Sequence, residues 1–482
     1  MFDLRPVLFI DGILLLILAL AMGVPVAVDL VDHASEWPAF LAALSFSAFI
    51  GLALVFGNLV RGWPVLTTRQ AFFLTVSSWL LVALFASLPF HFSSVHLSIT
   101  DGVFETISGI TTTGATVLMG LDTAPHALLI WRAMLQWLGG AGIIVTALSL
   151  LPVLRIGGMQ IFRLENSDKL NNTHQRLSKL VGRSLLIYGL FSLIIALALL
   201  WAGMTPLEAA CHAMATLSTG GFSTSDQSLG HFGEAARWIC VLGMLAGSLT
   251  FSGYSPSSRR GRWPVLADSQ VRWFFWCVIG FSLLLTFWNW AAGDMDPDDA
   301  FRHSVFNVVS ILTTTGFHSV DYDAWGGFAQ ITFFIISFIG GCTGSTAGSI
   351  KVFRYEVLFA VTGVHIRRLL QPHGVFPIHF NRLQVSDAVI RSVLGFVMLY
   401  FICLASLGLA LTFCGLDAIS SLSGAASALG NVGPGLGRVL GPSGSYQGVS
   451  DCAKWLLAAG MLLGRLELAP PLILFSRAFW RG

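Results

Sequence analysis

The sequence predicts an all-α polytopic membrane protein, with about ten transmembrane helices, four pseudo-fourfold repeats around one central pore, and an extra N-terminal helix pair. Three observations support this fold class. The 482-residue chain is 55% hydrophobic and only 11% charged, which is far too apolar for an ordinary soluble protein. Apolar runs long enough to cross a bilayer recur along the chain. Short polar stretches that end in glycine lie between these runs at four matching places.

Each crossing of the hydrocarbon layer needs roughly 20 apolar residues, because an α-helix rises about 1.5 Å per residue through a layer about 30 Å thick. The first run carries Asp11 and is too long for the apolar part of a signal peptide, so we interpret it as a retained span. We expect spans at residues 7–28, 38–59, 70–90, 127–151, 184–203, 236–255, 272–292, 327–349, 389–414 and 452–475.

The distribution of basic residues among the loops predicts the orientation of these spans. Basic residues gather in alternate loops, and the opposite loops hold only Arg237, Arg302, Arg438 and Lys454. By the positive-inside rule, both termini are predicted to be cytoplasmic. The 27 basic and 25 acidic residues nearly cancel, so no nucleic-acid partner is expected. The seven cysteines show neither a CxxC pair nor a metal-ligand spacing, so neither a zinc site nor a disulfide scaffold is expected, and most of them are predicted to be inert residues in apolar helices.

The four glycine-ended stretches align with one another and define an internal repeat. They are Ser108–Gly114, Met214–Gly220, Ser310–Gly316 and Ser427–Gly433. Each has one apolar span before it and one after it, so the repeat unit is a span, a short half-helix, a glycine loop and a second span. This predicts an N-terminal pair at residues 1–66 and repeats at 67–155, 180–256, 268–370 and 385–482.

The chemistry of the four loops favours a monovalent cation. Threonine and serine supply hydroxyl and carbonyl oxygens, and glycine allows the positive φ that turns carbonyls inward. No carboxylate stands at the centre of any loop, and each half-helix directs the negative end of its dipole toward the loop. Small-residue helix packing could explain one such stretch. It does not readily explain four at matching places, and irregular backbone at membrane depth favours a water-filled path.

The segments Thr111–Thr116, Leu217–Phe222, Leu312–Phe317 and Ala428–Pro434 resemble the filter loops of the Trk/Ktr/HKT superfamily of potassium transporters, most closely the bacterial TrkH/TrkG type. The resemblance covers essentially the whole chain, and the N-terminal helix pair favours the TrkH type over the eight-span Ktr type. Glycine at position 114, where sodium-preferring plant relatives have serine, favours potassium. The implied potassium filter comprises Thr112, Thr113, Gly114, Ser218, Thr219, Gly220, Gly221, Thr314, Thr315, Gly316, Asn431, Val432 and Gly433.

The resemblance also implies partners and a location. It implies K⁺ as the bound and transported ion, no covalent cofactor, a homodimer, and a cytosolic nucleotide-binding regulatory subunit of TrkA type. The expected location is a bacterial inner membrane, with the lipid bilayer as the surrounding partner.

A second polar stretch, Gly340–Ser349, interrupts an apolar run in the third repeat. Each glycine costs a helix roughly 1 kcal/mol relative to alanine, so a broken helix is expected. The resemblance implies an intramembrane gating loop, although close helix packing is an alternative. The expected gate residues are Gly340, Gly341, Gly344, Ser345, Gly348, Lys351 and Arg465. Lys351 could tie the loop to a carboxylate or to carbonyls. Arg465 could face the conduction path or form a structural ion pair with another helix.

Other function classes find less support in the sequence. The chain has neither GxxxxGK[ST] nor GxGxxG, so it carries no nucleotide motif of its own. An intramembrane enzyme would need a motif such as HExxH or GxSxG, which is absent. An alternating-access transporter predicts inverted repeats, whereas these four share one orientation. A sodium-permeable or ion-coupled cation symporter of the same fold remains an alternative to potassium uptake.

Overall fold

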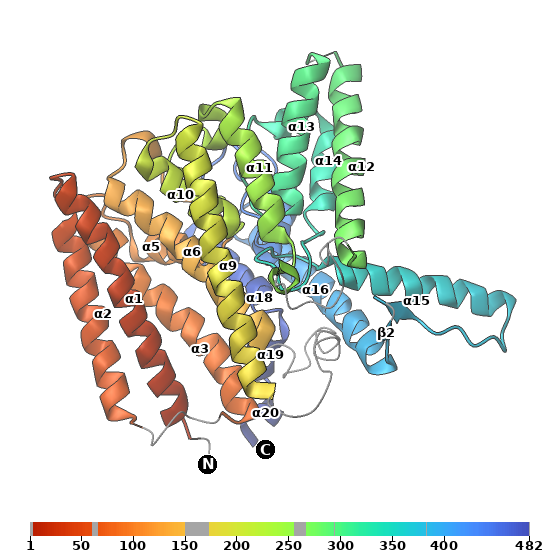
Figure 1. The fold of residues 1–482 in the computed structure, drawn as a ribbon, viewed down its shortest axis with the longest axis horizontal. Helices are drawn as coiled ribbons and strands as arrows, with labels where there is room; N and C mark the ends of the chain where they lie inside the picture. The colour runs from red at the N-terminus through yellow and green to blue at the C-terminus, as the bar shows by residue number, and fades with distance from the viewer. Residues whose placement is uncertain are drawn as a thin grey trace.

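The computed structural model describes residues 3–59, 66–149, 173–254, 267–293, 295–381 and 383–481. Within these ranges the chain is a helical bundle with one short β-hairpin, whose two strands have two residues each. This agrees with the all-α prediction. Both termini emerge on the same side of the bundle (Figure 1).

The longer helices are α1 (Arg5–Val31), α2 (Trp37–Gly57), α3 (Thr68–Ala86), α6 (His126–Ser149), α9 (Thr173–Trp201), α11 (Glu234–Ser248), α12 (Ser269–Ala291), α14 (Gly327–Ile336), α15 (Val352–Leu370), α16 (Asp387–Phe413) and α18 (Asp451–Arg465). The short helices that precede the glycine loops are α5 (Ile99–Ile110), α10 (Pro206–Leu217), α13 (Pro297–Leu312) and α17 (Ala418–Gly430). Smaller elements are α4 (Leu88–Phe92), α19 (Ala469–Leu474), α20 (Arg477–Arg481), β1 (His379–Phe380), β2 (Leu383–Gln384), and the 3₁₀ turns η1 (Leu121–Thr123), η2 (Ser228–His231), η3 (Phe251–Tyr254), η4 (Tyr322–Trp325) and η5 (Tyr446–Gly448).

Seven helical segments in the described part of the chain are long and apolar enough to cross a membrane. They are Arg5–Val31, Trp37–Gly57, Thr68–Phe92, His126–Ala147, Ser178–Trp201, Ser269–Ala291 and Asp387–Phe413. Each overlaps one of the spans expected from hydropathy. Six of these segments expose large apolar side chains on the outside of the bundle, as expected for a surface that faces lipid, whereas His126–Ala147 is mostly buried.

The other three expected spans, at residues 236–255, 327–349 and 452–475, are not single helices. Helix α11 ends at Ser248, α14 ends at Ile336, and α18 ends at Arg465. After α18, Glu467 and Leu468 both have positive φ, near 60°. The glycines of Gly340–Ser349 predicted a break in the span 327–349, whereas hydropathy located neither the end of α11 nor the end of α18.

The breaks are possible at membrane depth because other parts of the chain bond the freed backbone groups. The Cys342 N–H donates to the Ser248 carbonyl at 2.9 Å, which joins the end of α11 to the segment after α14. The Gly340 N–H donates to the Ile350 carbonyl, also at 2.9 Å. Unpaired backbone groups in a bilayer cost several kcal/mol each, so irregular backbone survives only when it is buried and bonded in this way.

Three of the four short helices begin with polar caps. Ser98, Thr205 and Asp417 each accept a bond from a backbone N–H in the first turn of α5, α10 and α17. Such caps satisfy N–H groups that have no partner within the helix and fix where these three helices start. At α13 the Asp296 side chain makes no such bond, and Pro297 starts the helix with a residue that has no N–H to satisfy.

Helices α1 and α2 form an antiparallel hairpin on one flank of the bundle (Figure 1). A Cβ added at Gly12 would lie 2.9 Å from the Gly51 carbonyl oxygen, so the helices pack at backbone distance there. Asp11 accepts a 2.8 Å hydrogen bond from Ser77 of α3, which connects the hairpin to the rest of the chain. At another edge, α15 projects outward beside the antiparallel β1–β2 hairpin, in which His379 pairs with Gln384.

The structure contains one disulfide that the sequence did not suggest. Cys414, at the end of α16, and Cys452, in the first turn of α18, form a disulfide with a Cα–Cα distance of 6.1 Å. No local pattern reveals this pair, because 38 residues separate the two positions. The other five cysteines are free, and three of them are buried, as expected for cysteines that fill apolar helices.

We expect thiol alkylation of the denatured, unreduced protein to modify five of its seven cysteines, and reduction to expose the remaining two. Mass spectrometry of intact protein measures this number directly. In a Cys452→Ser variant, all remaining cysteines should react without reduction because Cys414 loses its partner. A Cys403→Ser control should lose one reactive thiol in both conditions. Complete alkylation of the unreduced parent chain would contradict the assignment.

Candidate functional site

The four short helices end in the same backbone turn, and these turns meet at the centre of the bundle. In each turn an N–H bonds back to the carbonyl five residues earlier. These bonds are Thr113 to Ser108, Gly220 to Ala215 and Thr315 to Ser310, each 2.8 Å, and Val432 to Ser427, 3.0 Å. The preceding N–H of each turn bonds the carbonyl three residues earlier. This pair of bonds is the Schellman motif, which closes a helix C-terminus.

A residue in the left-handed conformation stands at the same position of every turn. These residues are Thr112, Thr219, Thr314 and Asn431, with φ between 52° and 57°. Glycine is the usual residue there, and asparagine is the next commonest. For the β-branched threonines this conformation costs roughly 1–2 kcal/mol each. Strain of this kind persists only where the surroundings enforce it, and it is concentrated at functional sites.

Two residues later, each turn has a left-handed glycine that touches the next loop. A Cβ added at Gly114 would lie 2.3 Å from the carbonyl oxygen of Gly220, and one at Gly221 would lie 2.0 Å from that of Thr315. The corresponding distances are 2.1 Å from Gly316 to the Val432 carbonyl and 2.5 Å from Gly433 to that of Thr113. Each loop therefore contacts the next in cyclic order, and the fourth contacts the first. The four loops form a closed ring that leaves no space for a side chain at these glycines.

The ring corrects the alignment of the second loop by one residue. The sequence alignment pairs Gly220 with Gly114, Gly316 and Gly433. In the structure, Gly221 has the positive φ, 83°, and makes the equivalent contact. Gly220 instead corresponds to Thr113, Thr315 and Val432, whose carbonyls face the neighbouring glycines. Two consecutive glycines obscured this register, since either can adopt a positive φ.

All predicted filter residues lie in this ring. The side chains of Thr112, Thr113, Ser218, Thr219, Thr314, Thr315 and Asn431 are fully buried, and Val432 is nearly so. Gly114, Gly221 and Gly316 are partly exposed, which is consistent with an opening along the axis of the ring. The C-terminal ends of four helices converge here, so their partial negative charges favour a cation. The described residues contain no cluster of three His, Cys, Asp or Glu that could hold a metal by side chains alone.

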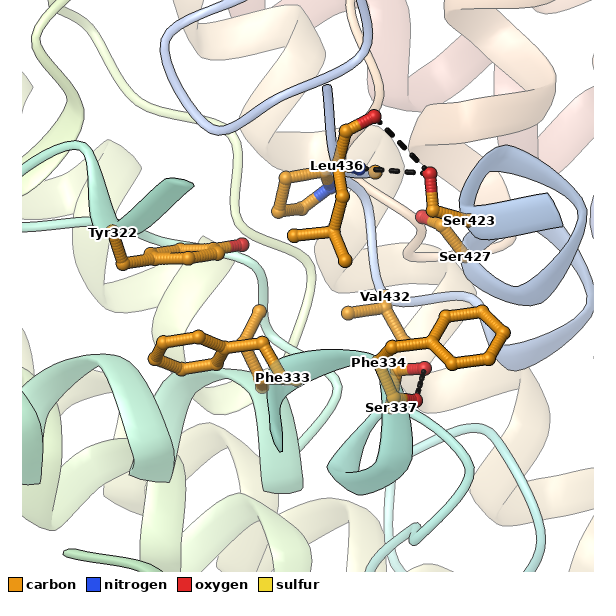
Figure 2. Close-up of a pocket in the computed structure, with 11 residues that line it drawn as sticks. Tyr322, Phe333, Phe334, Ser337, Ser423, Ser427, Val432 and Leu436 are labelled. Carbon is orange, nitrogen blue, oxygen red and sulfur yellow. Dashed lines mark hydrogen bonds between the residues drawn. The ribbon is translucent and has the colours of Figure 1, made fainter. Parts of the chain in front are cut away.

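The fourth loop differs from the others in its side chains. Asn431 donates to the Thr113 hydroxyl at 3.0 Å and to the Met461 carbonyl at 2.9 Å. The Gly433 carbonyl accepts from Ser427 and Tyr446, each at 2.8 Å. Figure 2 shows a pocket behind this loop, where Val432 faces mainly apolar side chains that include Phe333 and Phe334. The residues that line this pocket are mainly apolar, so the pocket does not suggest an ion path. These residues pack against the fourth loop from behind.

The segment predicted to be a gate is non-helical and lies against three of the four loops. The Thr346 hydroxyl lies 3.0 Å from the Leu217 carbonyl oxygen and 3.3 Å from the Thr219 hydroxyl. The Gly348 N–H donates to the Thr314 hydroxyl at 2.7 Å. A Cβ at Gly348 would lie 2.3 Å from the Gly430 carbonyl oxygen. The segment therefore contacts the second, third and fourth loops at or next to their strained residues.

The remaining predicted gate residues fix this segment internally or to neighbouring backbone. Gly341 accepts from the Val352 N–H, Gly344 accepts from the Phe251 N–H, both at 3.3 Å, and Ser345 donates to the Cys342 carbonyl at 2.6 Å. Lys351 donates to the Ala347 carbonyl, which is the backbone alternative of the two expected for it.

Arg465 meets the segment from α18. One guanidinium nitrogen, Nη1, donates to the Thr346 carbonyl at 2.8 Å. The side chain is 97% buried, and its Nε and Nη2 have no hydrogen-bond partner among the described residues. Glu467 pairs with Arg354 instead. The described residues thus give Arg465 no ion pair, and its charge lies against the segment below the ring.

Sequence reasoning missed a buried ion pair beside the ring. Arg132 of α6 and Glu105 of α5 are almost fully buried, and the Arg132 Nε donates to the Glu105 Oε1 at 2.8 Å. Glu105 also accepts from the Thr116 hydroxyl and the Val117 N–H, just after the first loop. Arg132 also donates to the Ser223 carbonyl, just after the second loop, at 3.0 Å. The sequence signal for this pair was the charge of Arg132 within the predicted span 127–151, because charges inside a membrane are costly and usually functional.

Gln136 lies one turn after Arg132 on the same face of α6 and was also missed. Its amide nitrogen donates to the Gly220 carbonyl at 2.6 Å, and its amide oxygen accepts from the Phe222 N–H at 3.0 Å. The side chain is fully buried. A neutral glutamine in a membrane helix gives little signal in sequence, so only the structure connects it to the ring.

Comparisons with known proteins agree with this architecture. The sequence model of the TrkH family, described as cation transport protein, matches residues 50–481. The Trk system potassium uptake protein TrkI of Halomonas elongata is 40% identical over 99% of this chain and 97% of its own. The Trk system potassium uptake protein TrkH of Escherichia coli is 36% identical over 99% of both chains.

A solved structure extends the similarity to the fold. The crystal structure of the potassium transporter TrkH from Vibrio parahaemolyticus matches with a TM-score of 0.91 and 34% identity, and the match covers 100% of both chains. The predicted family and fold class are therefore confirmed. A full-length match of sequence and structure to a transport family also agrees with the prediction that the chain is not an enzyme. The chain belongs to the TrkH family of cation transport proteins.

Proposed function

We propose that this chain is the potassium-conducting membrane subunit of a Trk uptake system. The closed ring of four loops is the observation that carries the proposal, because it sets backbone carbonyls and partly exposed glycines around one axis. Carbonyl dipoles replace the hydration shell of a large monovalent cation without the full charges that a divalent ion prefers. Relatives along the full length are named as potassium uptake proteins.

The proposed filter comprises the thirteen residues expected from the sequence, from Thr112 to Gly114, Ser218 to Gly221, Thr314 to Gly316 and Asn431 to Gly433. An inward-negative membrane potential contributes about 2.3 kcal/mol per charge per 100 mV, which drives K⁺ inward without ATP hydrolysis by this chain. Glycine at position 114 supports potassium over sodium, since a side chain there would displace the neighbouring carbonyl.

The proposed gate is the segment Gly340–Ser349 together with Lys351 and Arg465. Its hydrogen bonds to the second and third loops and its close approach to the fourth support a position on the ion path directly below the filter. Arg465 adds a buried positive charge against this segment, which raises the barrier to a cation. In this proposal, conduction requires the segment to leave its bonds with the filter loops.

The proposed assembly is a homodimer in a bacterial inner membrane, bound on its cytoplasmic side to a nucleotide-binding subunit of TrkA type. The words "Trk system" in the relatives' names support a membrane subunit that works with others. Both termini lie on one side of the bundle, which agrees with the cytoplasmic orientation expected from the basic residues.

Potassium or rubidium uptake into proteoliposomes tests the function directly. The purified chain, under an imposed inward-negative potential, is expected to take up Rb⁺ in a saturable way and to discriminate against Na⁺ and Li⁺. Equal uptake of Na⁺ would favour the sodium-permeable alternative. Uptake that requires a proton or sodium gradient would favour an ion-coupled symporter. Absence of uptake both with and without the cytosolic subunit would contradict a conducting pore.

Gly114→Ser is expected to lower the potassium-to-sodium permeability ratio by about tenfold, a change of about 1.4 kcal/mol between the two ions. The added Cβ would lie 2.3 Å from the Gly220 carbonyl oxygen and would displace it from the ring. Reversal potentials in bi-ionic conditions measure the ratio. Gly203→Ser is the matched control, since Gly203 also has positive φ but has no atoms within 4 Å of an added Cβ. An unchanged ratio in Gly114→Ser would argue against the filter.

Thr346→Val is expected to raise basal conduction roughly fivefold, because it removes the hydroxyl that bonds the gate to the second loop and a hydrogen bond contributes about 1 kcal/mol. Rb⁺ uptake without the cytosolic subunit measures the effect. Thr343→Val is the control within the same segment, since the Thr343 hydroxyl has no partner among the described residues. If both variants and the parent chain take up Rb⁺ equally, the Thr346 hydroxyl bonds do not hold the gate closed.

Arg465→Met is expected to raise Rb⁺ flux by roughly tenfold, the effect of lowering the barrier by about 1.4 kcal/mol. Methionine keeps much of the side-chain volume and removes the charge beside Thr346. Arg237→Met, which removes an arginine that bonds the Phe232 carbonyl away from the gate, should leave the flux unchanged. A folded Arg465→Met protein with unchanged or reduced flux would show that Arg465 is not a barrier.

A further inference from the structure

The polar face of α6, formed by Arg132 and Gln136, contacts the second loop at Gly220, Phe222 and Ser223. We propose that Gln136 is a specificity-determining residue, which sets ion discrimination by holding the Gly220 carbonyl, and that the Arg132–Glu105 pair positions the same loop. This inference rests on the proposed function of the ring as a potassium filter. It concerns residues behind the ring, none of which belongs to the four loops themselves.

The orientation of the Gln136 amide follows from its two partners. The Phe222 backbone N–H is a donor, so it requires the amide oxygen at 3.0 Å. The amide nitrogen must then face the Gly220 carbonyl oxygen, which lies 2.6 Å away. A single side chain therefore fixes both an acceptor and a donor of the second loop, on either side of the left-handed Gly221.

This contact makes the four equivalent carbonyls of the ring unequal. They belong to Thr113, Gly220, Thr315 and Val432, each of which faces the glycine of the preceding loop. Among the described residues, only the Gly220 carbonyl in this set accepts a hydrogen bond from a side chain. A carbonyl held by a donor is less free to move and offers less of its lone-pair density to an ion. Discrimination between K⁺ and Na⁺ depends on both the rigidity and the field strength of such carbonyls.

The buried ion pair holds the next part of the same loop. Arg132 donates to the Ser223 carbonyl, and its guanidinium carbon lies 4.1 Å from the centre of the Phe222 ring. Its remaining nitrogens bond Glu105 and the Thr116 hydroxyl at 2.8 and 3.1 Å. Both Glu105 oxygens also have partners, so the pair is fully bonded despite its burial. Gln136 therefore acts on a loop whose outer end is already fixed.

The test is the potassium-to-sodium permeability ratio of Gln136→Met in proteoliposomes, beside the parent chain. Methionine keeps the length and flexibility of the side chain and removes only the amide. The ratio is expected to fall roughly fivefold or more, the factor that corresponds to one neutral hydrogen bond. Trp137→Phe is the matched control, because it removes a part-buried bond from the same helix that goes to Ser192 of α9 and not to any of the four loops. Its ratio should equal that of the parent chain.

Each outcome has a separate meaning. A selective parent chain with an equally selective Gln136→Met variant would overturn this inference and leave the proposed function intact. A parent chain that does not discriminate potassium from sodium would overturn both. If Gln136→Met does not fold, Gln136→Asn keeps the amide but shortens its reach by one methylene, and its ratio is also expected to fall. A folded Gln136→Asn protein with the parent ratio would then overturn the inference.

Discussion

The architecture depends on the contact between each left-handed glycine and the carbonyl of the next loop. Four such contacts close the ring, and each requires a glycine because a Cβ would lie at most 2.5 Å from the neighbouring oxygen. The rest of the bundle holds the loops in this arrangement. Capped short helices deliver the loops to the centre, and buried polar side chains hold them from behind. The strained threonines beneath the glycines show that the surrounding structure enforces the geometry.

Such a centre places polar backbone groups within an apolar bundle, and nearby segments form hydrogen bonds with these groups. Helices α11 and α14 end where their last carbonyls or the following residues bond another segment, and the side chain of Arg465, the last residue of α18, bonds the Thr346 carbonyl. The segment between α14 and α15 occupies the space left by these breaks. Its hydrogen bonds to the strained Thr219 and Thr314 connect the irregular region below the ring to the ring itself. A conformational change in the irregular region should therefore alter the ring, and a change in the ring should alter the irregular region.

Much of this arrangement could be predicted from the sequence because its signals are local. Apolar runs located seven membrane-length helices, and the repeated glycine stretches located the four turns. The non-helical segment followed from the density of glycines between Gly340 and Ser349. The register of the second loop was misjudged because Gly220 and Gly221 are interchangeable in sequence, and only φ distinguishes them. The breaks in α11 and α18, the Cys414–Cys452 bond and the contacts of Arg132 and Gln136 depend on residues far apart in the chain, which no local pattern reveals.

The four loops belong to one polypeptide, and this has a consequence for how the pore can change. In a pore built from four identical subunits, one codon change alters all four positions around the axis at once. Here the same change alters one quarter of the ring. The equivalent positions Thr113, Gly220, Thr315 and Val432 already differ from one another, and each has its own neighbours behind it. Ion preference can therefore be adjusted in small, separately heritable steps, while three unaltered loops maintain the opening.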